Sequence, residues 1–275
     1  MDAGSTYTVR HIGITRPELF DPTESARIFR IANRLHHKTH PETIRQIVLF
    51  EEGGQVTTQL LEESERLLRQ KNYVYDASIR ADVACGTSLV DVEIEVRDVW
   101  AWMPNLGITR TGGDDRFELG FSNINLMGSG RQLNVAGFDG LDRDGFSMSF
   151  RDPNLNGSRT ALNASIGRTT DGESRAIVIG QPFYALDAKT SWSVAYARSS
   201  FLLPIYQDAA VASEFRRKSD QTTVSRGWSR GLERGAANRW TVGYSYDRHA
   251  FSEFSGMPAF ADRTFSYPWV QYEHI

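Results

Sequence analysis

The stretch that decides the fold is Trp102–Leu155, WMPNLGITRTGGDDRFELGFSNINLMGSGRQLNVAGFDGLDRDGFSMSFRDPNL. Large apolar residues take every second position in three of its runs, which are Phe117-Leu119-Phe121, Leu133-Val135 and Phe146-Met148-Phe150. A period of two places side chains on alternating faces of a strand, and Asp144-Gly145 beside such a run indicates a hairpin turn. In a soluble sandwich the apolar face would point into a core, whereas in an outer-membrane barrel it would contact lipid.

Three ordered motifs favour the outer-membrane interpretation. They are TGGDDR at Thr111–Arg116, NLMGSG at Asn125–Gly130 and FRDPNLNGSR at Phe150–Arg159. At this spacing they resemble the first barrel strands of the BamA/TamA outer-membrane assembly superfamily, also known for its bacterial surface antigens. The resemblance extends from about the start of the chain to about residue 200, and it implies an antiparallel transmembrane β-barrel sheet over residues 101–275.

The first hundred residues carry mixed strand and helix signals. Tyr7–Ile14 is expected to be a strand with Val9, His11 and Gly13 on one face. A helix is expected at about residues 24–38, either covering the domain or lying as a basic helix on a membrane surface. Thr39 and Glu42 have the spacing of a capping box, which predicts a helix that runs to Gly53-Gly54.

A second helix and two strands follow. Thr57 or Thr58 is expected to cap a helix whose apolar stripe is Leu60, Leu61, Ser64, Leu67 and Leu68. Alternation then predicts strands at Tyr75–Ala84 and Leu89–Val96.

The segments FEEGGQVT at Phe50–Thr57 and LLEESERLL at Leu60–Leu68 resemble the signature of a POTRA domain, the periplasmic module of the same superfamily. This resemblance implies a β-α-α-β-β domain over residues 1–100, with the helix at about 24–38 inserted in it. Residues 101–275 would then be the N-terminal part of the barrel.

In POTRA domains the strand after the second helix lies at a sheet edge. We therefore expect Tyr75–Ala84 to be the edge of a three-stranded sheet, with Leu89–Val96 in the middle and Val9–Ile14 beyond it. An exposed edge can accept an extended chain as an added strand. The candidate client-binding residues are Ala77, Ser78, Ile79, Arg80, Ala81, Asp82 and Val83; alternatively, Asp76, Arg80 and Asp82 blunt this edge.

Composition excludes several other classes of protein. A net charge of −3 gives no reason to propose nucleic acid as a partner, and Cys85, the single cysteine, can form no internal disulfide. His36, His37 and His40 lie close together without metal-ligand spacing, and no catalytic or nucleotide-binding motif is present. We expect no enzyme activity, cofactor or metal. Met1–Ser5 lacks the features of a secretory signal, so we expect a signal upstream of this chain.

The barrel is expected to be incomplete. A membrane strand takes ~9–11 residues, so the stretch after Met103 holds about ten or eleven strands. The strand near Leu106–Arg110 should pair with its successor only, and not with a strand beyond Trp240. Seven residues should share the outer face of the sheet: Leu119, Phe146, Met148, Leu162, Trp240, Val242 and Tyr244.

The resemblance implies a bacterial outer-membrane protein with its N-terminal domain in the periplasm. Its partners would be outer-membrane lipid and unfolded outer-membrane or secreted proteins, which it would help to insert into or move across the membrane. One alternative is a barrel that secretes or displays a linked enzyme domain outside this chain. A second is a soluble β-sandwich binding protein with an α/β cap.

Overall fold

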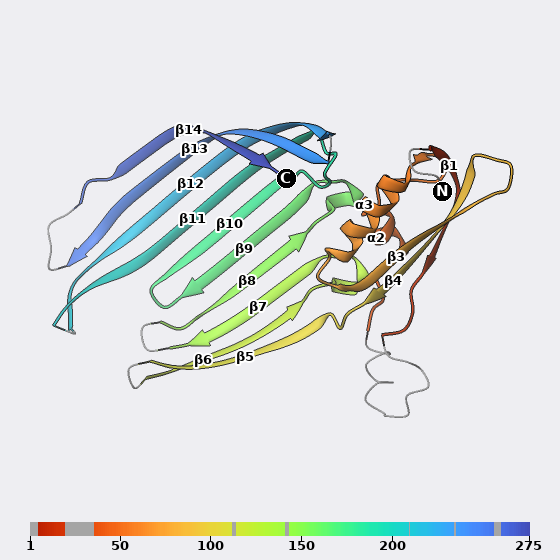
Figure 1. The fold of residues 1–275 in the computed structure, drawn as a ribbon. Coiled ribbons are helices and arrows are strands. Elements are labelled where there is room, and N and C mark those ends of the chain that lie inside the picture. Colours follow the sequence, from red (N-terminus) through yellow and green to blue (C-terminus); the bar gives the residue numbers. More distant parts are fainter. Residues whose placement is uncertain are drawn as a thin grey trace, which may run out of the picture. The chain divides into compact units, whose positions relative to one another are not determined.

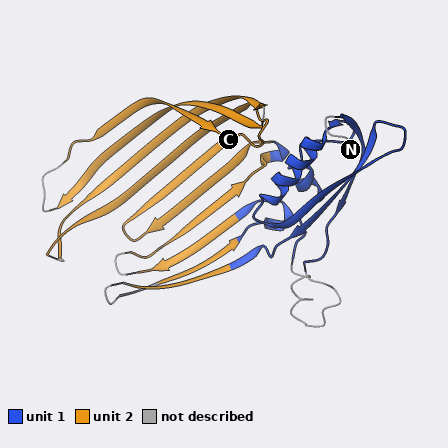
Figure 2. Ribbon diagram, viewed as in Figure 1, with its two compact units in different colours: residues 1–103, 123–132, 156–158 blue, residues 104–122, 133–155, 159–275 orange. Residues whose placement is uncertain are grey.

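The computed structural model describes residues 5–19, 36–111, 114–140, 143–208, 210–233, 235–255 and 260–275. The chain forms two compact units (Figure 2). Unit 1 comprises residues 1–103, 123–132 and 156–158, and unit 2 comprises 104–122, 133–155 and 159–275. Within the described ranges no helix has the length and apolar character needed to cross a membrane. The helix expected at about 24–38 falls almost entirely outside them.

Unit 1 contains a four-stranded sheet in the order β2-β1-β4-β3. Its strands are β1 (Tyr7–Thr15), β2 (Gln55–Val56), β3 (Val74–Val83) and β4 (Leu89–Asp98). β4 lies parallel to β1 and antiparallel to β3. The predicted arrangement of the three longer strands, with β3 at the edge, is confirmed. The prediction of three strands is wrong by one, because the two residues of β2 pair with Tyr7 and Thr8.

The core of unit 1 follows from alternation in β4. Its even-numbered residues Val90, Val92, Ile94 and Val96 are all buried. Leu61, Leu67 and Leu68 from α3 (Thr58–Arg69) are also buried, as predicted. The predicted cap at Thr57 is confirmed, since its hydroxyl accepts the Leu60 N–H.

Two local predictions in unit 1 are wrong. The helix before α3 is only α2 (Pro41–Arg45), and its N-cap is His40 instead of Thr39. In β1 the buried residues are Val9 and Ile12, because the pairing with β4 shifts between Val9 and His11. Such a bulge adds one residue and moves the following side chains to the other face.

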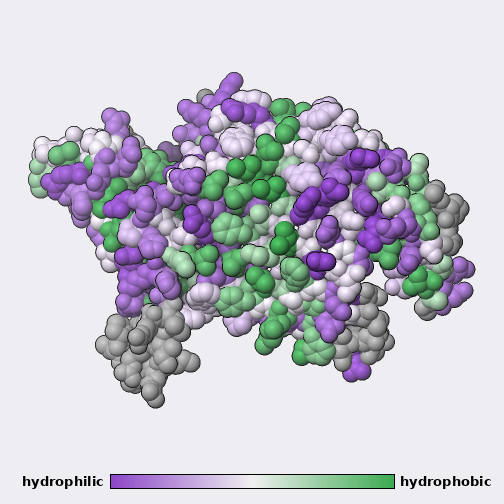
Figure 3. Space-filling view, turned by 180° about the vertical axis from the view of Figure 1, so that it is seen from behind, coloured by the Kyte–Doolittle hydropathy of each residue, from purple (hydrophilic) through white to green (hydrophobic). Residues whose placement is uncertain are grey.

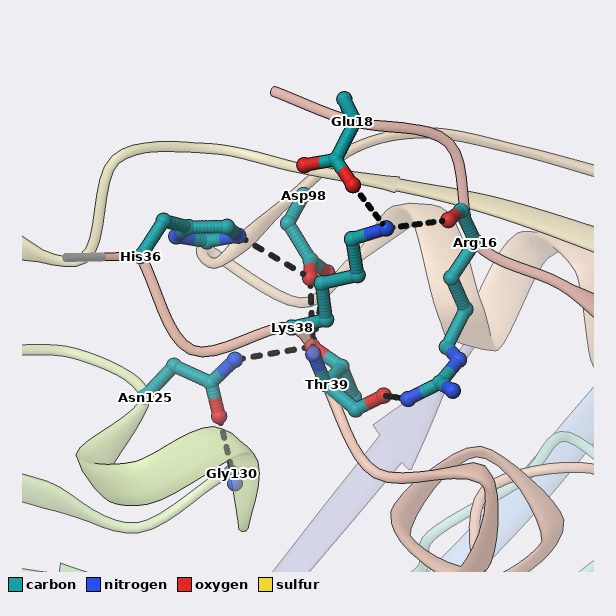
Figure 4. A network of polar contacts seen from close by, with 8 residues as sticks. All are labelled: Arg16, Glu18, His36, Lys38, Thr39, Asp98, Asn125 and Gly130. Carbon is teal, nitrogen blue, oxygen red and sulfur yellow. Dashed lines mark hydrogen bonds and ion pairs between the residues drawn. The ribbon is translucent and has the colours of Figure 1, made fainter. Parts of the chain in front are cut away.

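Thr39 does not cap α2, because its side chain donates a hydrogen bond to a buried carboxylate (Figure 4). Asp98 at the end of β4 accepts the Thr39 N–H and the Thr39 hydroxyl, both at 2.7 Å, and His36 Nε2 lies 3.4 Å from the same side chain. Asn125 Nδ2 donates to the Thr39 hydroxyl at 2.8 Å, and Asn125 Oδ1 accepts the Gly130 N–H at 2.7 Å. This network fixes three segments of unit 1 that are distant in sequence.

The NLMGSG segment therefore has a structural role in unit 1. The Gly128 carbonyl accepts the His40 N–H at 2.8 Å and the Thr43 hydroxyl at 3.1 Å. Gly128 has φ 72°, and a Cβ there would lie 2.3 Å from the Lys38 carbonyl oxygen, so only glycine fits. Burial, together with the nearby Asp98, raises the pKa of the Tyr73 hydroxyl well above its ordinary value.

Unit 2 is built on one ten-stranded antiparallel sheet, in which strands β5 to β14 lie in sequence order (Figure 1). Its predicted meander and number of strands are confirmed. Within the described chain β5 has β6 as its sole neighbour and β14 has β13, so the predicted absence of a β5 pairing beyond Trp240 is also confirmed. The strands are β5 (Trp102–Thr111), β6 (Asp114–Asn123), β7 (Gln132–Asp139), β8 (Gly145–Asp152), β9 (Ala161–Thr169), β10 (Gly172–Gln181), β11 (Thr190–Gln207), β12 (Ala210–Glu233), β13 (Ala236–Ser255) and β14 (Arg263–His274).

The register places large apolar side chains on one face of this sheet, here called the apolar face. Cross-strand partners share a face, and one such row runs through Leu162, Ile179, Val194, Val224 and Tyr244. Figure 3 shows a zone of apolar residues across the middle of the sheet, with hydrophilic residues toward the ends of the strands. The opposite, polar face carries small residues, with Ser193 bonded to Ser225 at 2.7 Å and Thr223 to Ser245 at 3.0 Å.

All seven residues predicted to share the outer face lie on the apolar face. The cross-strand register connects six of them across β8 to β13. The seventh, Leu119, precedes Gly120 in β6, so the two residues lie on opposite faces. Gly120 lies beside Asn105 and Ala136 on the polar face, which places Leu119 on the apolar face. None of the seven is buried, and Leu119 is 66% exposed. A core between two sheets, as the β-sandwich alternative requires, would bury these side chains.

We expect Asp98→Asn to destabilise unit 1 by about 2–4 kcal/mol, because it removes a charged acceptor and leaves buried donors without a strong partner. Hydrogen exchange of the α3 amides in the full chain measures this loss. Asp91→Asn is the matched control on the same strand, since Asp91 pairs with Arg10 in solvent. Equal protection of the α3 amides in both variants would contradict the role assigned to Asp98.

Candidate functional site

The candidate site is the free edge of β3 in unit 1. Among the described strands β3 pairs with β4 alone, and the register is continuous from Asp76 to Val83. The N–H of Ile79 points away from β4, since it donates to a side chain of α3. Because backbone groups alternate along a strand, the N–H and C=O groups of Ala77, Ala81 and Val83 point the same way.

Two side chains of α3 occupy the first half of this edge. Glu65 Oε2 accepts the Ile79 N–H at 2.8 Å, and Arg69 Nε donates to the Ala77 carbonyl at 2.8 Å. Arg69 also pairs with Glu65 and with Asp76, each at 3.1 Å. The Ala77 N–H donates to Asp76 Oδ1 at 2.9 Å. An incoming strand would have to displace these contacts in order to bind here.

The second half of the edge is open. Ala81 and Val83 have no edge hydrogen bond among the described residues, and their predicted role in strand addition stays compatible with the geometry. Ser78, Arg80 and Asp82 direct their backbone groups toward β4 and thus contribute side chains alone. The structure leaves the role of all seven residues in client binding as a prediction.

The blunting alternative holds in part, because Asp76 was among the expected residues whereas Glu65 and Arg69 were not. Asp76 does cap the edge, whereas no edge contact involves Arg80 or Asp82 within the described chain. Glu65 and Arg69 were missed as edge caps because their i,i+4 spacing also suits an ordinary ion pair on a wet helix face. The signal that could have found them is the position of this pair on the helix preceding an edge strand.

Comparisons with known proteins show similarity at the level of fold. No protein-family model matches the chain, and no curated protein matches it. A structure of BamA from Haemophilus ducreyi lacking POTRA domains 1–3 is similar, with 16% identity, a TM-score of 0.50 and coverage of 91% of this chain and 52% of that one.

CdiB structures from two bacteria are also similar. The protein from Acinetobacter baumannii has 11% identity and a TM-score of 0.46, covering 98% of this chain and 53% of its own. The protein from Escherichia coli has 13% identity and a TM-score of 0.48, covering 98% and 42%. This chain thus spans about half the length of the structures it matches or less. The ten-stranded sheet resembles the BamA barrel in fold.

We expect Glu65→Ala to speed hydrogen exchange at the Ile79 amide by about tenfold or more, because a hydrogen bond to a charged group contributes ~1.5–3 kcal/mol. Exchange at residue resolution in the full chain measures the effect. Glu62→Ala is the matched control, since Glu62 is exposed on the same helix. Unchanged exchange at Ile79 in Glu65→Ala would mean that Glu65 does not cap the edge.

Proposed function

We propose that this chain belongs to an outer-membrane protein of the BamA/TamA type, which binds unfolded protein clients and aids their insertion into or passage across the membrane. The observation that carries the proposal is the exposed apolar face of the ten-stranded sheet. Trp240, Val242 and Tyr244 on this face are 54%, 41% and 47% exposed. A monomeric soluble protein rarely exposes so large a contiguous apolar surface.

A lipid environment accounts for both faces of the sheet. The strands of unit 2 have 8 to 24 residues, and most reach the ~9–11 that a tilted membrane strand requires. Apolar residues would contact acyl chains, while the small hydroxyl-rich residues of the polar face would line an interior. The fold similarity to BamA and the three sequence motifs support the same placement.

Unit 1 would serve as a POTRA-like periplasmic domain that receives clients at the β3 edge. Its strands and helices occur in the order expected from the POTRA resemblance, with the short β2 added. An unfolded chain presents unpaired backbone groups, which can add to an edge strand without strong sequence selectivity. The open groups of Ala81 and Val83 would start the pairing, and displacement of Glu65 and Arg69 would extend it.

Membrane placement can be tested on one strand. Val224 lies on the apolar face of β12 and Gln221 lies on its polar face, and both are exposed. We expect Val224→Arg to lower the folding stability in lipid bilayers by about 2–4 kcal/mol, and Gln221→Arg to change it by roughly 1 kcal/mol or less. Denaturant titration in liposomes measures both. Equal effects of the two variants would argue against a lipid-facing surface.

Client binding can be tested by removing one donor from the open half of the edge. We expect Ala81→Pro to weaken binding of a fluorescent unfolded outer-membrane-protein peptide to the full chain in detergent by about tenfold, because proline has no N–H. Ala81→Ser keeps the N–H and should bind like the wild type. Glu65→Ala should bind more tightly, since it frees the Ile79 N–H. Equal binding by all four proteins would exclude strand addition at β3.

A further inference from the structure

A hollow of about 410 Å³ lies on the apolar face of unit 2, beside the β9–β10 hairpin. Residues from five neighbouring strands line it. They include four cations, one carboxylate and two large apolar side chains: Arg168, Arg175, Arg198, Lys218, Glu173, Phe146 and Ile166. Positive charges therefore outnumber negative ones by three in its walls. Four cations gathered at one place on the apolar face need an explanation.

The cross-strand register concentrates these charges. Arg175 lies directly opposite Arg198, and like charges in that position destabilise a sheet. Arg198 has an acidic partner on its other side, Asp220, at 3.5 Å. Arg175 has Ile166 there instead. The guanidinium of Arg175 therefore has no acidic cross-strand partner.

Three of the cations have no carboxylate partner in the part of the chain that the structure describes. Within the described chain, Arg168, Arg175 and Lys218 form no ion pair, although Arg168 is the register partner of Glu173. By contrast, the neighbouring Arg216 is neutralised by Glu253 at 2.7 Å, and Arg143 by Asp171 at 3.0 Å. Three of the four cations of the hollow are thus unmatched among the described residues, whereas Arg216 and Arg143 close to it are matched.

The position of the hollow along the strands indicates which kind of anion would reach it. Ile177 and Ile179 follow Arg175 on the same face, so the cations lie at the border of the apolar zone. This end of the strands holds the Thr170-Asp171 turn, while at the opposite end the chain enters β5 from unit 1, and the connecting segments 123–132 and 156–158 are part of unit 1. If unit 1 is periplasmic, as proposed above, the hollow lies at the outer leaflet, which is made of phosphorylated glycolipid.

We propose that this hollow binds the phosphate groups of an outer-leaflet glycolipid of the lipid A type. Arg168 and Arg175 form planar forks that match phosphate oxygens, and Lys218 adds a point charge. Phe146 and Ile166 offer apolar contact for the beginning of the acyl chains. The inference rests on the proposed membrane placement and adds a specific lipid to it.

The test uses the full chain in detergent micelles and compares the binding of three probes by native mass spectrometry and thermophoresis. The probes are bis-phosphorylated lipid A, the same glycolipid without phosphates, and phosphatidylglycerol; inorganic phosphate is added as a competitor. We expect lipid A to bind at least tenfold more tightly than the other two lipids, with millimolar phosphate unable to displace it. Comparable binding of phosphatidylglycerol, or displacement by free phosphate, would overturn the assignment to the glycolipid.

Variants locate the binding. Arg168→Gln combined with Arg175→Gln should weaken lipid A binding by about tenfold or more. Arg226→Gln combined with Arg230→Gln also removes two positive charges, but from the part of β12 that is distant from Lys218 and the hollow. This control should leave binding unchanged. Equal affinity in both double variants would overturn the site. If the wild type inserts into bilayers and binds client peptide but shows no site-dependent lipid A binding, this inference fails alone; failure to insert at all would remove the proposed function as well.

Discussion

The cross-strand register of the ten-stranded sheet is the constraint on which unit 2 depends. A slip of one residue in any pair would move all the apolar side chains of that strand to the face that carries serine, threonine and glycine. Successive pairings keep Leu162, Ile179, Val194, Val224 and Tyr244 in one row. The chemical difference between the two faces is therefore a property of the whole sheet, and no single strand could produce it.

Unit 1 depends on a different kind of interaction, a buried carboxylate that organises a turn. Asp98 holds Thr39, and through it Asn125, while Gly128 accepts bonds from residues at the start of α2. These are polar contacts in a region where Asp98, Thr39 and Asn125 are each at most 5% exposed, so an unpaired member would cost free energy. The glycine-rich segment between β6 and β7 is thus part of unit 1 in packing, although it connects strands of unit 2.

Period-two alternation indicated the strands of unit 2 and the shared face of seven residues, whereas their arrangement in one antiparallel sheet was expected from the family resemblance. The same alternation predicted β3 and β4, and helical spacing predicted the apolar stripe of α3. Local patterns failed where a distant residue competed for a side chain. Thr39 has the spacing of an N-cap, but Asp98 binds it from 59 positions away. The bulge in β1 and the capping of Ile79 by Glu65 likewise depend on tertiary neighbours that spacing does not reveal.

The β3 edge combines two requirements that oppose each other. An open edge invites pairing with any extended chain, and proteins commonly protect such edges with charges. Here the protecting groups are side chains, Glu65 and Arg69, and they also pair with each other. If an incoming strand takes the Ile79 N–H and the Ala77 carbonyl, that ion pair gives the two displaced charges a partner at once. The protection can therefore be exchanged for a client without burying an unmatched charge, while Ala81 and Val83 offer a starting point that needs no displacement.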